Sequence, residues 1–208
     1  MEDVLDIYHL PDDPRYPTVC FDETSKQLVG EIATPLPAEP GQPKRYDYEY
    51  ERNGVQNLFM FFCPLRNWRH VKVTDRRTKV DYAHCMRELV DDLLPDAVRI
   101  RVVQDNLNTH TRAALYEVFP AAEAKRILDK LEFHYTPKHG SWLNMAEIEL
   151  SVLRRQCLDR RIPDKETLEQ ETTAWEQNRN VKAATVNWRF TTVDARIKLK
   201  RLYPSIED

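Results

Sequence analysis

Hydrophobic and polar residues alternate in short stretches over the first part of the chain, and the pattern changes near residue 80. Alternation of this kind is typical of half-buried β-strands. It predicts strands in the segments TVCFDET, YDYEYERNGVQNLFMFF and WRHVKVTD. The Asn53-Gly54 dipeptide in the second segment favours a tight hairpin turn, so we expect an antiparallel meander. Residues 1–17 contain three prolines and little periodicity, which indicates a polar lead-in.

Helical periodicity begins beyond that point. Apolar residues recur at helical spacing in VDYAHCMRELVDDLL, and Pro95 follows as a helix stop. Further strands are predicted in AVRIRVVQD and EFHYTP, and helices in TRAALYEVF, AAEAKRILDKL, NMAEIELSVLRRQCL and KETLEQETTAWEQNRN. This order predicts an α/β fold, in which a mixed sheet is flanked by helices. Ligands of such folds bind near the carboxyl ends of the strands.

The composition is that of one globular domain. The chain has 208 residues, of which 41% are hydrophobic, and this is enough for a packed core. No apolar run is long enough to cross a bilayer, and the acidic N-terminus lacks the layout of a signal peptide. The four cysteines stand singly without a C-x-x-C pair, which argues against a zinc ribbon or a disulfide framework. We therefore expect a cytoplasmic protein without a membrane partner.

The net charge of −3 does not by itself indicate a nucleic-acid partner, but the basic residues are clustered. Residues 66–79 contain six bases against Asp75 alone, and residues 154–161 contain four arginines. Local patches of this kind bind phosphate backbones, although they can also be ordinary solvated faces. The candidates for DNA contacts are Arg66, Arg69, Lys72, Arg76, Arg77, Lys79, Lys138, Arg154 and Arg155.

Three acidic positions are candidates for a metal site. Asp22 lies in the first predicted strand, and Asp105 ends the strand that follows the first long helix. The third position is Glu147 or Glu149, which share one predicted helix. The buried stripe of that helix is expected to consist of Ala146, Leu150, Leu153 and Cys157. The two glutamates then point roughly 160° apart, so periodicity does not choose between them.

Carboxylates that are far apart in sequence but close in space can hold two Mg²⁺ or Mn²⁺ ions. A single aspartate at a strand end, such as Asp105, is more often a turn or capping residue. The residues alone therefore leave both readings of VVQDNLNTH open, a metal site and a turn.

Three segments, VCFDET, VVQDNLNTH and YTPKHGSWLNMAEIE, resemble in order and spacing the catalytic blocks of the DDE transposases. The likeness is strongest to the bacterial insertion-sequence branch of the Tc/mariner superfamily. The resemblance assigns Asp22, Asp105 and Glu147 as catalytic and metal-binding residues, and so selects Glu147 over Glu149. Within the same blocks, supporting roles are expected for Asn106, His110 and Asn144. The resemblance also implies a ribonuclease-H-like fold and two bound Mg²⁺ or Mn²⁺ ions.

The chain departs from the family pattern at two places. The interval between Asp105 and Glu147 is longer than usual, and we expect the extra residues to form an added helix in VFPAAEAKRILDKL. The residue after Asn144, commonly proline in the family, is Met145. The catalytic domain is expected over residues 18–205. The helix-turn-helix domains typical of the family are not within these 208 residues, so we expect either that the chain is a fragment of a longer protein or that a separate upstream polypeptide supplies them.

The expected function is metal-dependent DNA strand cleavage and strand transfer in cut-and-paste transposition. The expected partners are transposon-end and target DNA and a second copy of the chain, in the bacterial cytoplasm and at the nucleoid when DNA is bound. Two alternatives stay open. One is a ribonuclease-H-like nuclease without joining activity. The other is a non-catalytic fragment that binds DNA or dimerises with a transposase.

Overall fold

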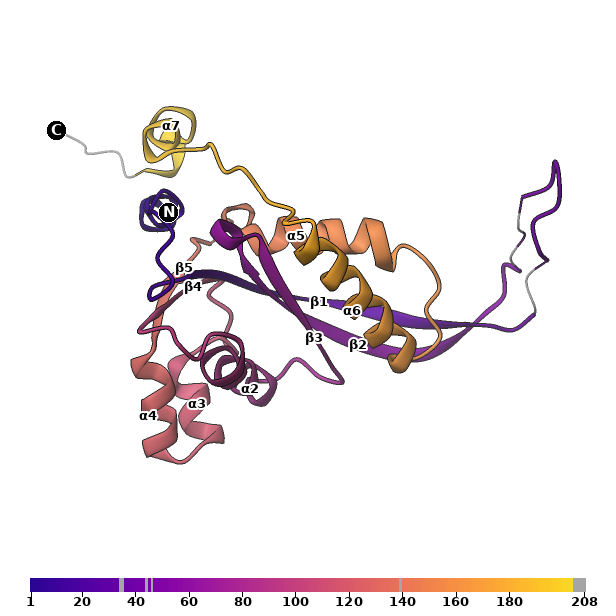
Figure 1. The fold of residues 1–208 in the computed structure, drawn as a ribbon, viewed down its shortest axis with the longest axis horizontal. Helices are drawn as coiled ribbons and strands as arrows, with labels where there is room; N and C mark the ends of the chain where they lie inside the picture. Colours follow the sequence, from indigo (N-terminus) through magenta and orange to yellow (C-terminus); the bar gives the residue numbers. More distant parts are fainter. Residues whose placement is uncertain (34–35, 44, 46, 139, 204–208) are drawn as a thin grey trace.

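The computed structural model describes residues 1–203 except residues 34, 35, 44, 46 and 139. It contains a five-stranded sheet in the order β3-β2-β1-β4-β5 (Figure 1). The strands are β1 (Thr18–Glu31), β2 (Tyr50–Cys63), β3 (Trp68–Thr74), β4 (Ile100–Gln104) and β5 (Leu131–Tyr135). The first three form an antiparallel meander, and β1, β4 and β5 are parallel to one another. The expected mixed sheet is confirmed. The expected end of the domain, at residue 205, lies outside the described residues.

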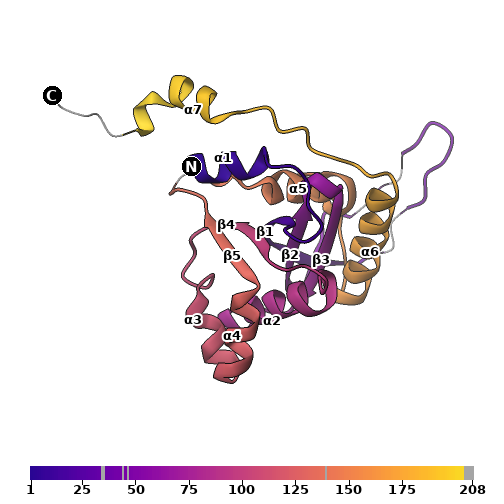
Figure 2. The same ribbon diagram turned by 60° about the vertical axis from the view of Figure 1, so that its left-hand side comes forward.

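Helices cover both faces of the sheet (Figures 1 and 2). One face carries α2 (Lys79–Glu88), α3 (Arg112–Val118) and α4 (Ala121–Asp129). The other carries α1 (Glu2–Tyr8), α5 (Met145–Leu153), α6 (Lys165–Val181) and α7 (Thr192–Lys198). Two π-turns, η2 (Leu89–Leu93) and η4 (Arg154–Leu158), extend α2 and α5. Short 3-10 turns are η1 (Pro64–Arg66), η3 (Ser141–Leu143) and η5 (Lys200–Leu202). Among the described residues, no helix has the length and apolar character needed to span a membrane.

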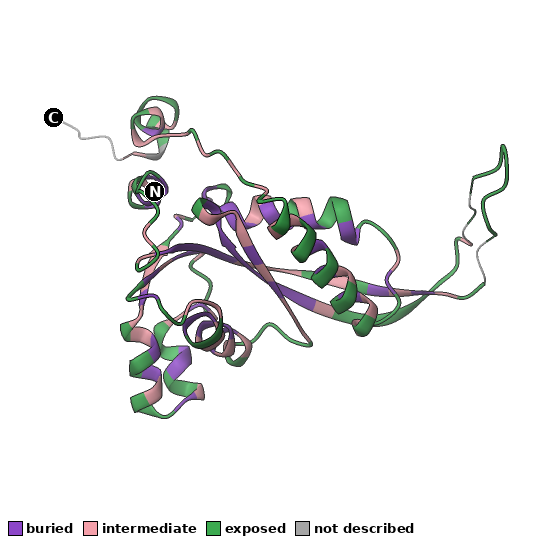
Figure 3. Ribbon diagram, viewed as in Figure 1, coloured by how far each residue is buried: buried purple, intermediate pink, exposed green. Residues whose placement is uncertain are grey.

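The central strands are apolar on both faces because both faces are buried. Figure 3 colours the ribbon by burial. Phe21 of β1 lies in the core beneath α2, whereas the preceding Cys20 lies in the core beneath α5. The apolar run at residues 58–63 of β2 divides between the two cores in the same alternating way. Because successive strand residues point to opposite faces, Asp22 lies on the α5 face and Glu23 on the α2 face.

The predicted hairpin turn at Asn53-Gly54 is wrong. Both residues lie inside β2, and the connection between β1 and β2 is the proline-rich segment 32–49. Gln27 pairs with Val55 and Val29 pairs with Arg52, so β2 carries an extra residue opposite β1. Gly54 adopts a positive φ of 97° at this bulge. An Asn-Gly dipeptide supplies positive φ to a bulge as readily as to a turn, so the local sequence did not distinguish the two.

The expectation of a polar lead-in is wrong for residues 2–8, which form the partly buried helix α1. Val4, Leu5, Ile7 and Tyr8 are buried in the core that α5 and α6 share. The Tyr8 hydroxyl donates a hydrogen bond of 2.7 Å to the backbone oxygen of Leu143. A helix of seven residues is too short to show a clear period, and its stability comes from packing on the rest of the domain.

β3 is an edge strand of the sheet, and α6 packs against this edge. The Asn180 side chain accepts a hydrogen bond from the Arg69 backbone N–H (2.9 Å) and donates one to the Arg69 backbone oxygen (2.8 Å). One turn earlier on α6, Glu176 accepts a hydrogen bond of 2.8 Å from the backbone N–H of Val71. Side chains of α6 thus occupy backbone groups that an open edge strand would offer to another chain.

Candidate active site

Asn144 joins the start of α5 to the strand that carries Asp22. Its Oδ1 accepts a hydrogen bond from the Ala146 backbone N–H (3.2 Å), which caps the helix. Its Nδ2 donates to the backbone oxygen of Phe21 (2.8 Å) and to Oδ2 of Asp22 (3.3 Å). The structure therefore brings the first and third sequence blocks together through one buried amide.

The Asp22 carboxyl lies among other acids. Burial raises the pKa of this carboxyl to about 7. A hydrogen bond from the Glu23 backbone N–H (2.9 Å) opposes the increase, whereas the negative charges of Glu23, Asp105 and Glu147 add to it. Asp105 and Glu147, the other two carboxylates singled out in the sequence, thus both act electrostatically on Asp22.

Asp105 follows the carboxyl end of β4 and is bound by His110. The distance from His110 Nδ1 to Asp105 Oδ1 is 2.7 Å, and that from His110 Nε2 to Glu23 Oε2 is 3.1 Å. The imidazole is buried and stacks on the Tyr82 ring, with 4.8 Å between centroids. Burial lowers the pKa of His110, but the close contacts with the carboxylates of Asp105 and Glu23 outweigh it and raise the pKa to about 9. At neutral pH a charged imidazole therefore joins two carboxylates.

The choice between Glu147 and Glu149 is clear from their surroundings. Glu149 is fully buried and accepts hydrogen bonds from Arg179 at 2.6 and 3.1 Å. It also forms an ion pair of 3.0 Å with Arg69. Glu147 lies in the first turn of α5, is partly exposed, and acts electrostatically on Asp22. The expected buried stripe is confirmed, because Ala146, Leu150, Leu153 and Cys157 are all buried.

The donor atoms of this site suit a hard divalent cation. Within the described part of the chain, no three His, Cys, Asp or Glu side chains lie together closely enough to hold a metal ion. Asp22, Asp105 and Glu147 offer only carboxylate oxygens, and the charges of Asp105 and Glu147 contribute to the raised pKa of Asp22. Mg²⁺ uses one or two carboxylates and keeps water and substrate phosphate as its other ligands. An open set of carboxylates fits such an ion better than it fits a structural metal.

The structure contradicts one predicted DNA contact. Arg69 is completely buried, and its guanidinium binds Glu149, Asn180 and the backbone oxygen of Ala184. The prediction was wrong because residues 68–74 form a strand, so alternate members of the basic run point inward. Arg69 and Val71 face α6 and the core beneath it.

Other members of the basic run are paired with acids. Arg66 binds Asp12 at 3.1 Å, Lys72 binds Glu88 at 2.5 Å, and Lys79 binds Glu117 at 2.9 Å. Arg76, Arg77, Arg154 and Arg155 are exposed. Fewer basic residues are therefore free of an acidic partner and available to bind a DNA backbone than the sequence indicates.

A cleft opens beside Asp105. Its lining consists of Asp105, Asn106, Leu107, Thr136, Pro137, Lys138 and Ser141. The structure thus places the predicted residues Asn106 and Lys138 next to the second acid. Glu23, Tyr82 and Gln104, which contact or support His110, were missed in the sequence. The only sequence signal for any of them was the position of Glu23 directly after Asp22.

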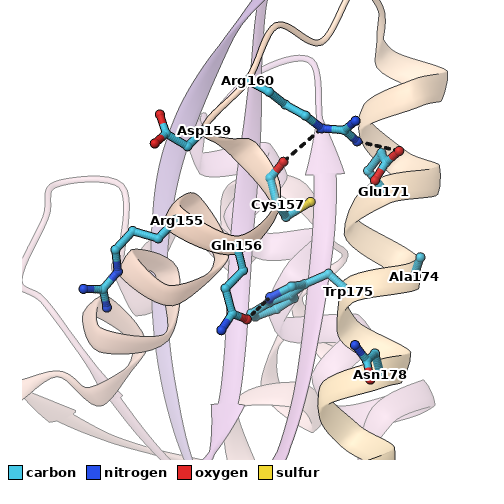
Figure 4. Close-up of a pocket in the computed structure, with 9 residues that line it drawn as sticks. All are labelled: Arg155, Gln156, Cys157, Asp159, Arg160, Glu171, Ala174, Trp175 and Asn178. Carbon is cyan, nitrogen blue, oxygen red and sulfur yellow. Dashed lines mark hydrogen bonds and ion pairs between the residues drawn. The ribbon is translucent and has the colours of Figure 1, made fainter. Parts of the chain in front are cut away.

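A second hollow lies between η4 and α6 and contains none of the three acids (Figure 4). Arg160 pairs with Glu171 at 2.5 Å across this hollow. The Trp175 Nε1–H donates a hydrogen bond of 3.0 Å to Gln156. Arg155 also lines the hollow, on the side of η4. The predicted contact Arg155 thus lines a different hollow from Lys138.

Several solved structures have a similar fold. The chain is similar to the Mos1 strand transfer complex, with a TM-score of 0.57 and 15% identity over 85% of this chain and 51% of that one. The Mos1 mariner paired end complex with Mn gives a TM-score of 0.56 and 15% identity, with 88% of this chain and 55% of that chain covered. The Mos1 transposase paired-end complex with the left transposon end gives a TM-score of 0.53 and 15% identity, with 88% of this chain and 56% of that chain covered. The chain spans about half the length of these proteins.

This likeness confirms the expected ribonuclease-H-like fold. A comparison with curated protein sequences found no match. The family model of the DDE superfamily endonucleases, by contrast, matches residues 17–169, which include Asp22, Asp105 and Glu147. Since this match covers most of the chain, the protein belongs to the DDE superfamily of endonucleases.

Proposed function

We propose that this chain is the catalytic domain of a transposase of the insertion-sequence branch of the Tc/mariner superfamily. It cleaves DNA strands at the ends of a mobile element and joins the freed ends to target DNA. The observation that carries this proposal is the way in which buried side chains join the three sequence blocks. The Asn144 amide binds both the start of α5 and the Asp22 carboxylate, and the His110 ring contacts both Asp105 and Glu23, the residue after Asp22. The charges of Asp105 and Glu147 also act on the Asp22 carboxyl.

In this proposal Asp22, Asp105 and Glu147 are the ligands of two Mg²⁺ or Mn²⁺ ions. Such a pair of ions, when bound, stabilises the attacking and leaving oxygens of phosphoryl transfer. Asn144 keeps Asp22 and the start of α5 in fixed relation through its hydrogen bonds to both. His110 holds Asp105 in the same way from the other side of the sheet. The residues thus supply a rigid frame on which ligand geometry depends.

DNA lies along the cleft beside Asp105 in this proposal. Lys138 and Asn106 line that cleft and contact phosphate oxygens. The exposed Arg76, Arg77, Arg154 and Arg155 extend the contact with the backbone without reading sequence. Arg66, Lys72 and Lys79 contribute less, since each is paired with an acid. Synapsis of two ends requires a dimer of this domain.

The first test is Mn²⁺ binding followed by electron paramagnetic resonance, together with nicking of supercoiled plasmid DNA. The wild-type chain is compared with Asp105→Asn and with Asp129→Asn. Asp129 is an exposed acid of α4 that pairs with Lys125. Asp129→Asn therefore makes the same substitution as Asp105→Asn at a position outside the site. We expect binding and nicking in the wild type and in Asp129→Asn, and loss of both in Asp105→Asn. Equal Mn²⁺ binding by all three proteins contradicts the proposal.

The same assay separates the alternatives. A transposase produces joined DNA in addition to nicked DNA, and this appears as plasmid products that carry a supplied 3′-OH end. Cleavage of an RNA–DNA hybrid without any joined product favours a ribonuclease-H-like nuclease. Binding of DNA by wild-type protein without any cleavage in Mn²⁺ favours a non-catalytic module.

A further inference from the structure

Glu23 is a buried carboxylate on the face of the sheet opposite to Asp22. Its side chain is 5% exposed, although it directly follows Asp22 on β1. Strand alternation directs it toward α2 and the cluster around Phe21, whereas Asp22 points toward Asn144 and α5. Glu23 is therefore separated by the sheet from the face on which Asp22 lies. Burial of a carboxylate is costly unless the charge is paired, so its partner is informative.

That partner is His110, whose two ring nitrogens face two different acids. Nε2 lies 3.1 Å from Glu23 Oε2, and Nδ1 lies 2.7 Å from Asp105 Oδ1. The contact with Glu23 is an ion pair and not an aligned hydrogen bond, because Oε2 has no hydrogen-bond partner. Charge attraction therefore holds Glu23 against the imidazole.

The imidazole has no room to turn. It lies against the ring of Tyr82, with 4.8 Å between centroids and 25° between planes. The Phe21 ring meets it edge-on, with centroids 5.5 Å apart. Gln104 donates a hydrogen bond of 3.2 Å to the backbone oxygen of His110 and accepts one of 3.1 Å from the Tyr82 hydroxyl. Residues of β1, β4 and α2 together fix both the ring and the loop that begins at Asp105.

We propose that Glu23 is a positioning residue, which orients the Asp105 carboxylate by anchoring the far side of the His110 ring. The proposal rests on the proposed function, in which Asp105 is a metal ligand. In metalloproteins a carboxylate commonly orients a histidine that binds the metal directly, and loss of that carboxylate weakens metal binding about 10- to 100-fold. Here the histidine orients a carboxylate ligand, and the acid behind the histidine is Glu23.

The test compares Glu23→Gln with Glu132→Gln in the full chain. Gln keeps the size of Glu23 but removes the charge on which the ion pair depends. Glu132 also contacts a histidine, His134, at 3.1 Å, but it is 42% exposed and lies outside the site. Thermal unfolding is recorded for both, so that metal affinities are compared between equally folded samples.

Two measurements are made at one fixed pH. In metal-free protein with ¹⁵N-labelled histidine, NMR detects the ring N–H groups of His110, assigned through their absence in His110→Gln. We expect the Nδ1–H signal, bonded to Asp105, to shift or broaden in Glu23→Gln and to stay unchanged in Glu132→Gln. With Mn²⁺ and plasmid DNA present, we expect roughly tenfold weaker Mn²⁺ binding in Glu23→Gln alone.

The outcomes separate this inference from the proposed function. An unchanged Nδ1–H signal together with wild-type Mn²⁺ affinity in Glu23→Gln overturns the positioning role and leaves the function intact. A changed signal in Glu23→Gln, with no Mn²⁺ binding by any protein even with DNA, supports the anchoring and overturns the function. In a double-mutant comparison with His110→Gln, additive losses of affinity also overturn the inference, since Glu23 acts through His110.

Discussion

Glu149 and Arg69 form an ion pair of 3.0 Å in which neither side chain is exposed to solvent. The pair joins α5 to the edge strand β3, and Arg179 of α6 binds the same carboxylate at 2.6 Å. One acid therefore fixes the rotation of the helix that carries Glu147. One of its two partners, Arg69, belongs to the basic run of residues 66–79 that the sequence associated with DNA.

Glu149→Gln is expected to destabilise the fold strongly. Removal of one partner from a buried ion pair leaves an uncompensated charge, which costs about 3–5 kcal/mol. The free energy of unfolding from urea denaturation measures this loss. The control is Glu117→Gln, which breaks the exposed pair with Lys79 and should cost less than about 1 kcal/mol. Equal losses in the two variants would show that the Glu149 carboxylate is not buried as described.

Asn144→Ala is expected to reduce both stability and metal affinity. The variant loses the cap of α5, worth about 0.5–2 kcal/mol, and also the contact between the amide and Asp22. Asp164→Ala is the matched control, because Asp164 caps α6 through Thr167 without contacting the site. Mn²⁺ titration and urea denaturation are made on both. If the two variants bind Mn²⁺ equally well, the amide has no part in arranging Asp22.

The stability of the metal-free protein is expected to fall as pH rises toward neutrality. The pKa of Asp22 is about 7 in the folded chain, against an ordinary value of 3.8. A raised pKa means that the folded state holds the proton more tightly than the unfolded state. Its contribution to stability is therefore complete below about pH 4 and is lost as pH rises through 7.

Urea denaturation between pH 4 and pH 8 measures this dependence, and Asp22→Asn isolates the carboxyl. Histidines with raised pKa values, such as His70 and His110, titrate in both proteins and cancel in the comparison. The wild type should lose stability more steeply than Asp22→Asn between about pH 4 and pH 7. Parallel curves would mean that the folded chain does not perturb Asp22.

Substitution of Arg76 and Arg77 by alanine is expected to weaken DNA binding without loss of stability. Both residues are exposed, and each phosphate contact contributes roughly one unit to the dependence of log K on log salt. Fluorescence anisotropy with a labelled duplex at several salt concentrations should show the slope reduced by about one to two units. Lys125→Ala, at the exposed pair with Asp129 on α4, should leave the slope unchanged. An unaltered slope in the double variant would exclude this patch from the DNA surface.

Several features followed from the sequence because they depend on local pattern. The apolar run at residues 58–62 predicted a strand, and it lies in β2. Helical spacing gave the buried stripe of α5, including Ala146 and Leu153. The order of the sequence blocks indicated the DDE family, which the family match confirms. The added helix expected between Asp105 and Glu147 is present as α4.

Tertiary structure alone decided how these elements face one another. Periodicity placed Glu147 and Glu149 on opposite flanks of α5, but only the packing of α6 and β3 shows that Glu149 is the buried one. Charge along the chain could not reveal that Arg69 points inward. The link from Glu23 through His110 to Asp105 joins residues far apart in sequence. Such contacts depend on the relative placement of strands and helices, which no local pattern of hydrophobic and polar residues encodes.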